Sequence, residues 1–349
     1  MLRHLAASRW VKPALLVVVL GFCGYALYAE RAAVAAALQN LSWYAVAGSL
    51  IAVIAGLGCM MLSWRALLAD LGSPLPLRPA IRVLFVGQLA KYVPGAVWAA
   101  GAQMELGRAY QVPRTRSATA AATSMLVALA TALLTAAVAL PLNSAGAARH
   151  YWWALILVLP AVIGLYPPLT SFLLNHGLRL VRRPPLERRI SASGMSRAVG
   201  WALLGWGFFS LHAWLLISSM TGAGLEVFPM AAGAFALAWS VGFILVPLPG
   251  GAGAREAAFV LALQPIMPRP SAIVIAVVSR LVMTVADLGW AGFGYWLGRG
   301  ELRRGVQAAG PAADNVTSRP PAAGQPGCGD GAETVATLRG EPGEHGSYP

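Results

Sequence analysis

Residues 246–256 read Val-Pro-Leu-Pro-Gly-Gly-Ala-Gly-Ala-Arg-Glu, and they lie between long apolar segments. Proline and glycine interrupt a helix, and irregular backbone inside a membrane is tolerated only where it is buried in protein or lines a wet cavity. Arg255 and Glu256 follow directly after the interruption. The stretch therefore predicts a broken helical hairpin that carries charge at membrane depth. The residues expected to form the break are Pro247, Pro249, Gly250, Gly251 and Gly253.

An earlier stretch has the same design. Lys91 precedes a break at Pro94 and Gly95, and a carboxylate and a guanidinium follow at Glu105 and Arg108. The surrounding segment is apolar enough to enter a membrane, but arginines precede it and follow it. Because arginine-rich flanks favour the cytoplasmic side, both ends are expected there. A re-entrant hairpin over residues 83–107 satisfies both constraints.

The composition places most of the chain in a membrane. Of its 349 residues, 58% are hydrophobic and only 11% are charged, far from the averages of globular proteins. The net charge of +13 comes from arginines in short clusters between apolar segments, which favours membrane topology over nucleic-acid binding. The three cysteines are widely separated, so neither a disulfide framework nor a metal site is predicted. We expect no cofactor.

Apolar segments and arginine clusters together predict an all-α polytopic membrane protein with about six to eight transmembrane helices. Eight or nine full spans in place of the hairpins remain an alternative. The expected spans are about 13–28, 42–64, 117–140, 151–174, 198–220 and 271–297, with a second hairpin at 228–267.

The two halves show the same series of elements. Residues 1–147 and 151–299 each give span, span, hairpin and span, starting from opposite faces. Such a series is typical of an inverted-topology repeat, in which the binding site lies near the midplane where interrupted segments meet. The membrane domain is predicted over 1–300. Residues 301–349 are rich in glycine, proline and polar residues and are predicted to be a disordered cytoplasmic tail.

Charged residues at membrane depth are costly and are therefore candidates for a site. Each also has an alternative to a role in substrate binding. Arg255 and Glu256 could form a structural ion pair, and Arg108 could be a membrane anchor. Asp287 could be the partner of Arg280 or a proton-linked carboxylate. His212 is interpreted as a packing residue. The predicted substrate-binding residues are Lys91, Glu105, Arg108, Arg255, Glu256, Arg280 and Asp287.

At these residues the chain resembles the flippase-like family of the lysylphosphatidylglycerol synthase transmembrane region. The resemblance covers about residues 10–300. Its first motif runs from Lys91-Tyr92-Val93-Pro94-Gly95 to Gly101 and Arg108, and its second is the stretch 247–256. Arg280 in the last span also fits. The resemblance implies a bacterial inner-membrane protein that handles a lipid with a polar headgroup. The placement of the arginines predicts that both termini are cytoplasmic.

The resemblance leaves the lipid open between a polyprenyl-linked sugar and an aminoacylated phospholipid, and the form of the first motif favours the sugar. The chain shows no soluble aminoacyl-transferase domain, so synthesis of lysylphosphatidylglycerol is not expected. We therefore expect a lipid transporter and not an enzyme. The alternatives are a membrane-embedded transferase and a non-catalytic partner of an envelope-lipid synthase that makes contact through the arginine-rich loop 179–197.

Overall fold

The computed structural model of the protein describes residues 39, 41–92, 98–143, 156, 158–180, 190–244 and 253–308. All regular elements in these ranges are helices. Five of them are long and apolar enough to cross a membrane, which confirms an all-α polytopic membrane protein. These five are Trp43–Asp70, Arg114–Ala139, Ala192–Thr221, Leu225–Ile244 and Arg269–Arg299. The predicted first span and the residues of both breaks before Gly253 lie outside the described residues.

The first half contains helix α4 (Trp43–Asp70), an interrupted arm and helix α7 (Arg114–Ala139). The interrupted arm is α5 (Leu77–Ile81), a π-helical turn η1 (Arg82–Val86) and a 3-10 turn η2 (Leu89–Tyr92). Helix α6 (Trp98–Arg108) returns along this arm and packs against η1 and η2. The segment thus forms a hairpin, as the sequence predicts.

The second half contains helix α11 (Ala192–Thr221), helix α12 (Phe228–Ile244), helix α13 (Ala254–Leu263) and helix α14 (Arg269–Ala308). A short 3-10 turn η5 (Leu225–Val227) connects α11 to α12, and another, η3 (Pro141–Asn143), follows α7 in the first half. Helix α11 ends at Gly222, whose φ of 68° is the left-handed conformation that terminates many helices. Helices α12 and α13 pack against each other and form the second hairpin.

The predicted span 151–174 differs from the structure. Two shorter helices occupy the described part of this region, α9 (Val158–Gly164) and α10 (Pro167–Leu180). Pro167 and Pro168 follow the interruption, and proline is favoured at the first position of a new helix but not inside one. Helix α14 continues past the predicted domain boundary at residue 300, as far as Ala308.

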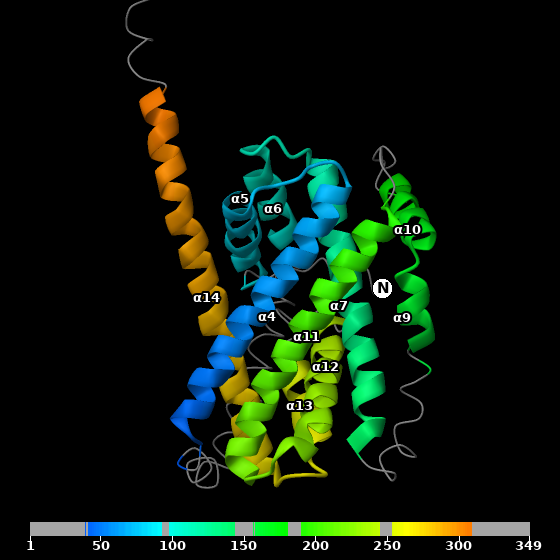
Figure 1. Cartoon of the computed structure of the whole chain (residues 1–349), viewed down its shortest axis with the longest axis vertical. Helices are drawn as coiled ribbons and strands as arrows, with labels where there is room; N and C mark the ends of the chain where they lie inside the picture. The colour runs from blue at the N-terminus through cyan, green and yellow to red at the C-terminus, as the bar shows by residue number, and fades with distance from the viewer. Residues whose placement is uncertain are drawn as a thin grey trace, which may run out of the picture. The chain divides into compact units, whose positions relative to one another are not determined.

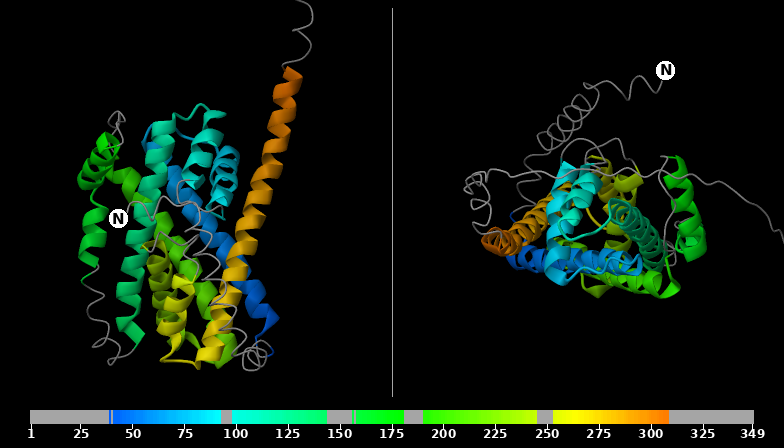
Figure 2. Two further views of the ribbon diagram at one scale, coloured as in Figure 1. Left: turned by 180° about the vertical axis from the view of Figure 1, so that it is seen from behind. Right: turned by 90° about the horizontal axis from the view of Figure 1, so that it is seen from above.

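Corresponding elements of the two halves run in opposite directions (Figure 1). Helix α4 rises in this view and α11 descends, while α7 descends and α14 rises. The hairpin of α5 and α6 lies toward one end of the bundle, and the hairpin of α12 and α13 lies toward the other, as the view from behind also shows (Figure 2). These directions are those that an inverted repeat requires. The repeat itself stays a prediction, because the first element of the first half lies outside the described residues.

Helices α4 and α11 form the most extensive helix contact of the described residues. Small residues let their backbones approach, which is how helices associate in a membrane. A Cβ atom on Gly205 would lie 3.2 Å from the carbonyl oxygen of Gly56, and one on Gly56 would lie 2.6 Å from the ring of Phe209. At the end of α4, Asp70 accepts hydrogen bonds from the backbone N–H and the hydroxyl of Ser191 at 2.7 and 2.6 Å. This carboxylate ties α4 to the start of α11.

Candidate membrane-embedded anion site

Helix α13 begins at a glycine that the backbone requires. Gly253 has φ 86° and ψ −53°, a conformation that side chains disfavour. Its N–H donates a 2.7 Å hydrogen bond to Oε2 of Glu256, as in a capping box. The Gly-Ala-Arg-Glu sequence therefore fixes the first turn of α13, and with it the directions of Arg255 and Glu256.

Arg255 lies at the contact between the two arms of the second hairpin. A Cβ atom on Gly242 of α12 would lie only 2.8 Å from the Cβ of Arg255, so a glycine there permits the approach. The guanidinium carbon of Arg255 lies 5.0 Å from the ring centroid of Phe235, also on α12. A cation at this distance from an aromatic face is attracted to it. Packing against α12 thus holds Arg255 near the start of α13.

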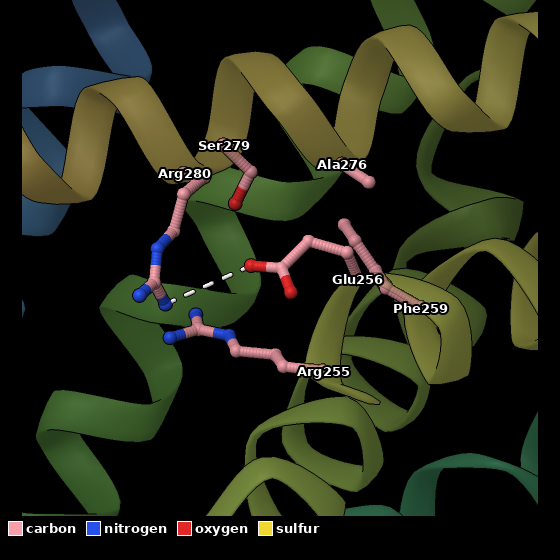
Figure 3. A pocket seen from close by; sticks show the side chains of 6 residues that line it. All are labelled: Arg255, Glu256, Phe259, Ala276, Ser279 and Arg280. Atoms are coloured by element: carbon pink, nitrogen blue, oxygen red, sulfur yellow. Dashed lines mark ion pairs between the residues drawn. The ribbon is translucent and has the colours of Figure 1, made fainter. Parts of the chain in front are cut away.

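Arg280 approaches the same place from α14. Its Nη1 lies 3.7 Å from Oε1 of Glu256, and the two side chains are only 30% and 22% exposed. The side chains of Arg255, Glu256 and Arg280 extend toward a common space (Figure 3). By chain position Arg280 is eleven residues into α14, which is about 16 Å along its axis and close to half the thickness of a bilayer core. The described residues thus place two guanidinium groups and one carboxylate at membrane depth.

A small open pocket lies between these side chains, with a cavity volume of about 10 Å³. A cavity of about 10–15 Å³ holds one water molecule, so a phosphate would enter only if these side chains moved apart. Two guanidinium groups donate several N–H bonds in a geometry that matches phosphate oxygens. The donors of the two guanidinium groups therefore suit a phosphate. Its lining residues are Arg255, Glu256, Phe259, Ala276, Ser279 and Arg280.

A buried histidine contacts Ser279, one of the residues that line the pocket. His212 on α11 is 0% exposed, and its Nε2 lies 2.9 Å from the hydroxyl oxygen of Ser279. Its ring meets that of Phe235 edge to face at 5.4 Å. Three helices of the second half therefore meet behind the pocket. The sequence indicates a packing role for His212, but it gives no sign of its contact with Ser279, which is 67 residues away in the chain.

Comparison with known proteins places the chain in a family. The model of the lysylphosphatidylglycerol synthase transmembrane region matches residues 9–290. The protein belongs to this family. Membership indicates a membrane protein with a role that involves lipids. No curated protein and no solved structure matches the chain.

Within the family domain, the other predicted site residues fall in different surroundings. Asp287 is 7% exposed and lies seven residues, or about 10 Å, beyond Arg280 along α14. Lys91 belongs to the turn η2 of the first hairpin. The expected roles of both residues stay predictions.

Glu105 and Arg108 lie together on an exposed surface of the same domain. Glu105 is 62% exposed and pairs with Arg108 at 3.1 Å and with Arg114 at 2.8 Å. The hydrogen bond from Arg114 and the charge of Arg108 hold the pKa of the Glu105 carboxyl below its ordinary value. Both residues thus lie in a surface ion-pair network, and the structure does not bring them together with Arg255 and Arg280. A role in substrate binding stays a prediction for them.

One polar residue of the first hairpin was missed in the sequence. Gln103 of α6 is 3% exposed, and its side-chain oxygen Oε1 has no hydrogen-bond partner among the described residues. A neutral side chain gives no charge signal in an apolar segment, so the sequence does not single it out. Among the described residues, no three His, Cys, Asp or Glu side chains lie where they could hold a metal ion.

Proposed function

We propose that this protein is a lipid flippase that moves a phosphate-containing headgroup across the bacterial inner membrane. The phosphate would bind between Arg255 and Arg280 while the lipid tails stay in the bilayer. The observation that carries the proposal is the convergence of these two guanidinium groups on one pocket with a single carboxylate, Glu256.

The cost of charge in a membrane supports this reading. Arginine at the centre of a membrane helix costs about 2.5–3.5 kcal/mol on insertion scales, and such residues usually face a cavity or a partner. Glu256 pairs with Arg280 at 3.7 Å. A phosphate would give both guanidinium groups a further anionic partner, and the N-terminal end of α13 would add a favourable field. The group bound most favourably would be an anion.

The contact between Glu256 and Arg280 would allow Arg280 to exchange the carboxylate for a phosphate. Its 3.7 Å separation is longer than a charge-assisted hydrogen bond, which is about 2.7–2.9 Å. Glu256 is also held by the N–H of Gly253, so it keeps a partner when Arg280 turns toward a phosphate. Binding of the headgroup therefore requires no carboxylate to be left without a partner.

The arginine clusters support an orientation with both termini in the cytoplasm. The arginines between residues 179 and 197 form the largest cluster and would fix the connection before α11 on the cytoplasmic side. The second hairpin would then enter the membrane from the outer face and the first from the inner face. A headgroup on the outer side would then meet the second hairpin, and one on the inner side would meet the first.

Translocation by the purified protein tests the proposal. Proteoliposomes would contain fluorescent phosphatidylglycerol, lysyl-phosphatidylglycerol or polyprenyl phosphate-linked glucose, with exposure of the label measured over time. We expect wild-type protein to move at least one of these lipids, and Arg255→Ala and Arg280→Ala to abolish the movement. The double variant should lose no more than either single variant, because both residues act on one phosphate.

Arg197→Gln provides a matched control. Arg197 is an exposed arginine on α11 whose Nε donates to the carbonyl of Ser193 within the same helix. This variant should translocate like the wild type. If none of the lipids moves, or if movement persists in folded Arg255→Ala and Arg280→Ala proteins, the proposal is wrong. Loss of a cellular phenotype on replacement of residues 179–197 alone would then favour a partner role.

A further inference from the structure

The polar lining of the pocket includes one neutral side chain, that of Ser279 on α14. Ser279 is 3% exposed, and its hydroxyl extends toward the space that Arg255, Glu256 and Arg280 share (Figure 3). A hydroxyl has one O–H donor and two acceptor lone pairs. The pocket therefore contains a possible hydrogen-bond donor besides the two guanidinium groups.

The hydroxyl of Ser279 differs from other buried hydroxyls of the second half. Ser210 and Ser240 each donate to the backbone carbonyl four residues earlier in their own helix, at 2.7 and 2.8 Å. Such bonds occupy the hydroxyl proton. The described hydrogen bond of Ser279 is instead to Nε2 of His212 on another helix, at 2.9 Å. Its hydroxyl thus lies between the imidazole and the pocket.

The surroundings of His212 indicate the direction of this hydrogen bond. His212 is 0% exposed, and Nδ1 has no hydrogen-bond partner of good geometry among the described residues. A neutral imidazole carries one N–H, and buried N–H groups without an acceptor are especially rare. The proton is therefore best placed on Nε2, which then donates to Oγ of Ser279. This leaves the hydroxyl proton of Ser279 available to the pocket.

An anion in the pocket would favour the same direction. A hydroxyl that meets an oxyanion donates its proton in a charge-assisted hydrogen bond. Hydrogen bonds in a chain polarise one another, so the hydroxyl oxygen then accepts more strongly from the N–H behind it. Donation would run from His212 through Ser279 to the anion, and no proton would change its owner.

Ser279 also differs from the two arginines in its freedom to move. The cavity holds about one water molecule, so the lining side chains must move apart before a phosphate enters. Arginine side chains rotate about several bonds, whereas serine has one such torsion and His212 contacts its oxygen. The hydroxyl is thus a fixed donor, around which the longer side chains rearrange.

We infer that Ser279 is a third phosphate-binding residue of this pocket, which donates a hydrogen bond to a phosphate oxygen, and that His212 positions its hydroxyl. The inference rests on the proposed function and deepens it. Arg255 and Arg280 supply charge, while Ser279 supplies a hydrogen bond of fixed direction.

The dependence of translocation on lipid concentration tests the role of Ser279. Proteoliposomes would contain fluorescent phosphatidylglycerol or polyprenyl phosphate-linked glucose at increasing mole fractions, after thermal melting has shown that each variant is folded. We expect Ser279→Ala to raise the half-saturating mole fraction about tenfold, the size of one hydrogen bond to a charged group. Ser240→Ala is the matched control, since Ser240 is 1% exposed and bonds within its own helix. It should keep the wild-type value.

Two substitutions of His212 separate positioning from packing. Glutamine places an N–H donor about where Nε2 lies, and leucine has none. We expect His212→Leu to raise the half-saturating mole fraction as Ser279→Ala does, and His212→Gln to stay within about threefold of wild type. The double variant Ser279→Ala/His212→Leu should show no further rise, because both changes remove one hydrogen bond to the phosphate. Effects that add would contradict the positioning role.

Nitrogen NMR of protein with isotope-labelled histidine measures the position of the proton directly. The signals of His212 are those that disappear in His212→Gln. With phosphatidylglycerol bound, we expect a protonated Nε2 and an unprotonated Nδ1. A proton on Nδ1 alone would contradict the inference.

Failure of the inference differs from failure of the proposed function. If no lipid moves with wild type, the flippase function fails, and the inference fails with it. If lipids move and Arg255→Ala abolishes the movement, but Ser279→Ala keeps the wild-type half-saturating mole fraction, only the role of Ser279 is wrong.

Discussion

The two hairpins have similar backbones and different chemistry. In the second, α13 carries Arg255 and Glu256 into a pocket that Arg280 shares. In the first, α6 carries Gln103 at a close contact with Gly87, and its charged residues Glu105 and Arg108 lie exposed near its end. Among the side chains that the structure describes, the partly buried ionic contact therefore lies at the second hairpin, although both segments carry charges in the sequence. The difference shows that a shared backbone plan can hold an ionic contact on one side and a neutral one on the other.

Making the two hairpins chemically alike should have the largest effect. Arg255→Gln gives α13 the residue that α6 has, and it removes a guanidinium from the pocket. Charge-assisted hydrogen bonds contribute about 1.5–3 kcal/mol each, so we expect the rate of headgroup translocation to fall by about 100-fold. The measurement is the proteoliposome assay, with Arg197→Gln as control. A fall of less than threefold in a folded protein would contradict the importance of this difference.

The reverse exchange should act on stability. Gln103→Arg places a guanidinium at a 3% exposed position of the first hairpin. Because an unpaired charge at membrane depth is costly, the free energy of unfolding should fall by about 3 kcal/mol. Thermal unfolding in detergent measures the loss, with Gln103→Met as the neutral control. Unchanged stability would mean that the first hairpin already offers an anionic partner.

Replacing the close-contact glycine by alanine should lower the stability of the protein in either hairpin. Gly87→Ala and Gly242→Ala each place a Cβ within 3.0 Å of the return helix, and overpacking of this kind costs about 1–3 kcal/mol of stability. Gly87→Ala should cost more, since it also meets backbone atoms of Gln103 at 3.1 and 3.2 Å. Thermal unfolding distinguishes them. Gly289→Ala on α14 is the control, since nothing lies within 4 Å of its added Cβ, and it should not destabilise.

The exposed ion pair of Glu105 and Arg108 in the first hairpin should contribute least to stability. Glu105→Gln removes a carboxylate whose folded-state pKa is lowered by Arg114 and Arg108. A lowered pKa contributes stability above the unfolded pKa of about 4.3, and that stability is lost as the pH falls through the folded pKa. Wild type should therefore melt slightly above Glu105→Gln at pH 7, and the difference should shrink as the pH is lowered below about 4. A large difference at pH 7, or loss of translocation, would return Glu105 to the site.

The sequence predicts the parts of the molecule where a helix is interrupted or where a charge enters the membrane. Proline and glycine in apolar segments predict two hairpins, and the described arms form them. Arg255, Glu256 and Arg280 stand out because charge is rare in a membrane, and the structure brings these three together. The division of the predicted span 151–174 at Pro167 could have been expected from its two adjacent prolines.

Other features depend on distances that a sequence does not contain. No charge and no sequence pattern marks the close contact of Gln103 with Gly87. The hydrogen bonds from Ser191 to Asp70 join residues 121 positions apart. Glu105 and Glu256 are both glutamates that follow a break, yet one is 62% exposed and the other 22%. Burial in each case is decided by which helix packs alongside, and neighbouring residues do not determine that.

The contact between α4 and α11 has a consequence for how such a site can arise. If the two halves were separate, identical chains, this contact would be the interface of a symmetric dimer, with Gly56 and Gly205 at the crossing. Symmetry would then oblige both hairpins to carry the same residue, two arginines or two glutamines. Joining the halves in one chain removes that obligation. A single polypeptide can thus carry an arginine in one hairpin and a glutamine in the other.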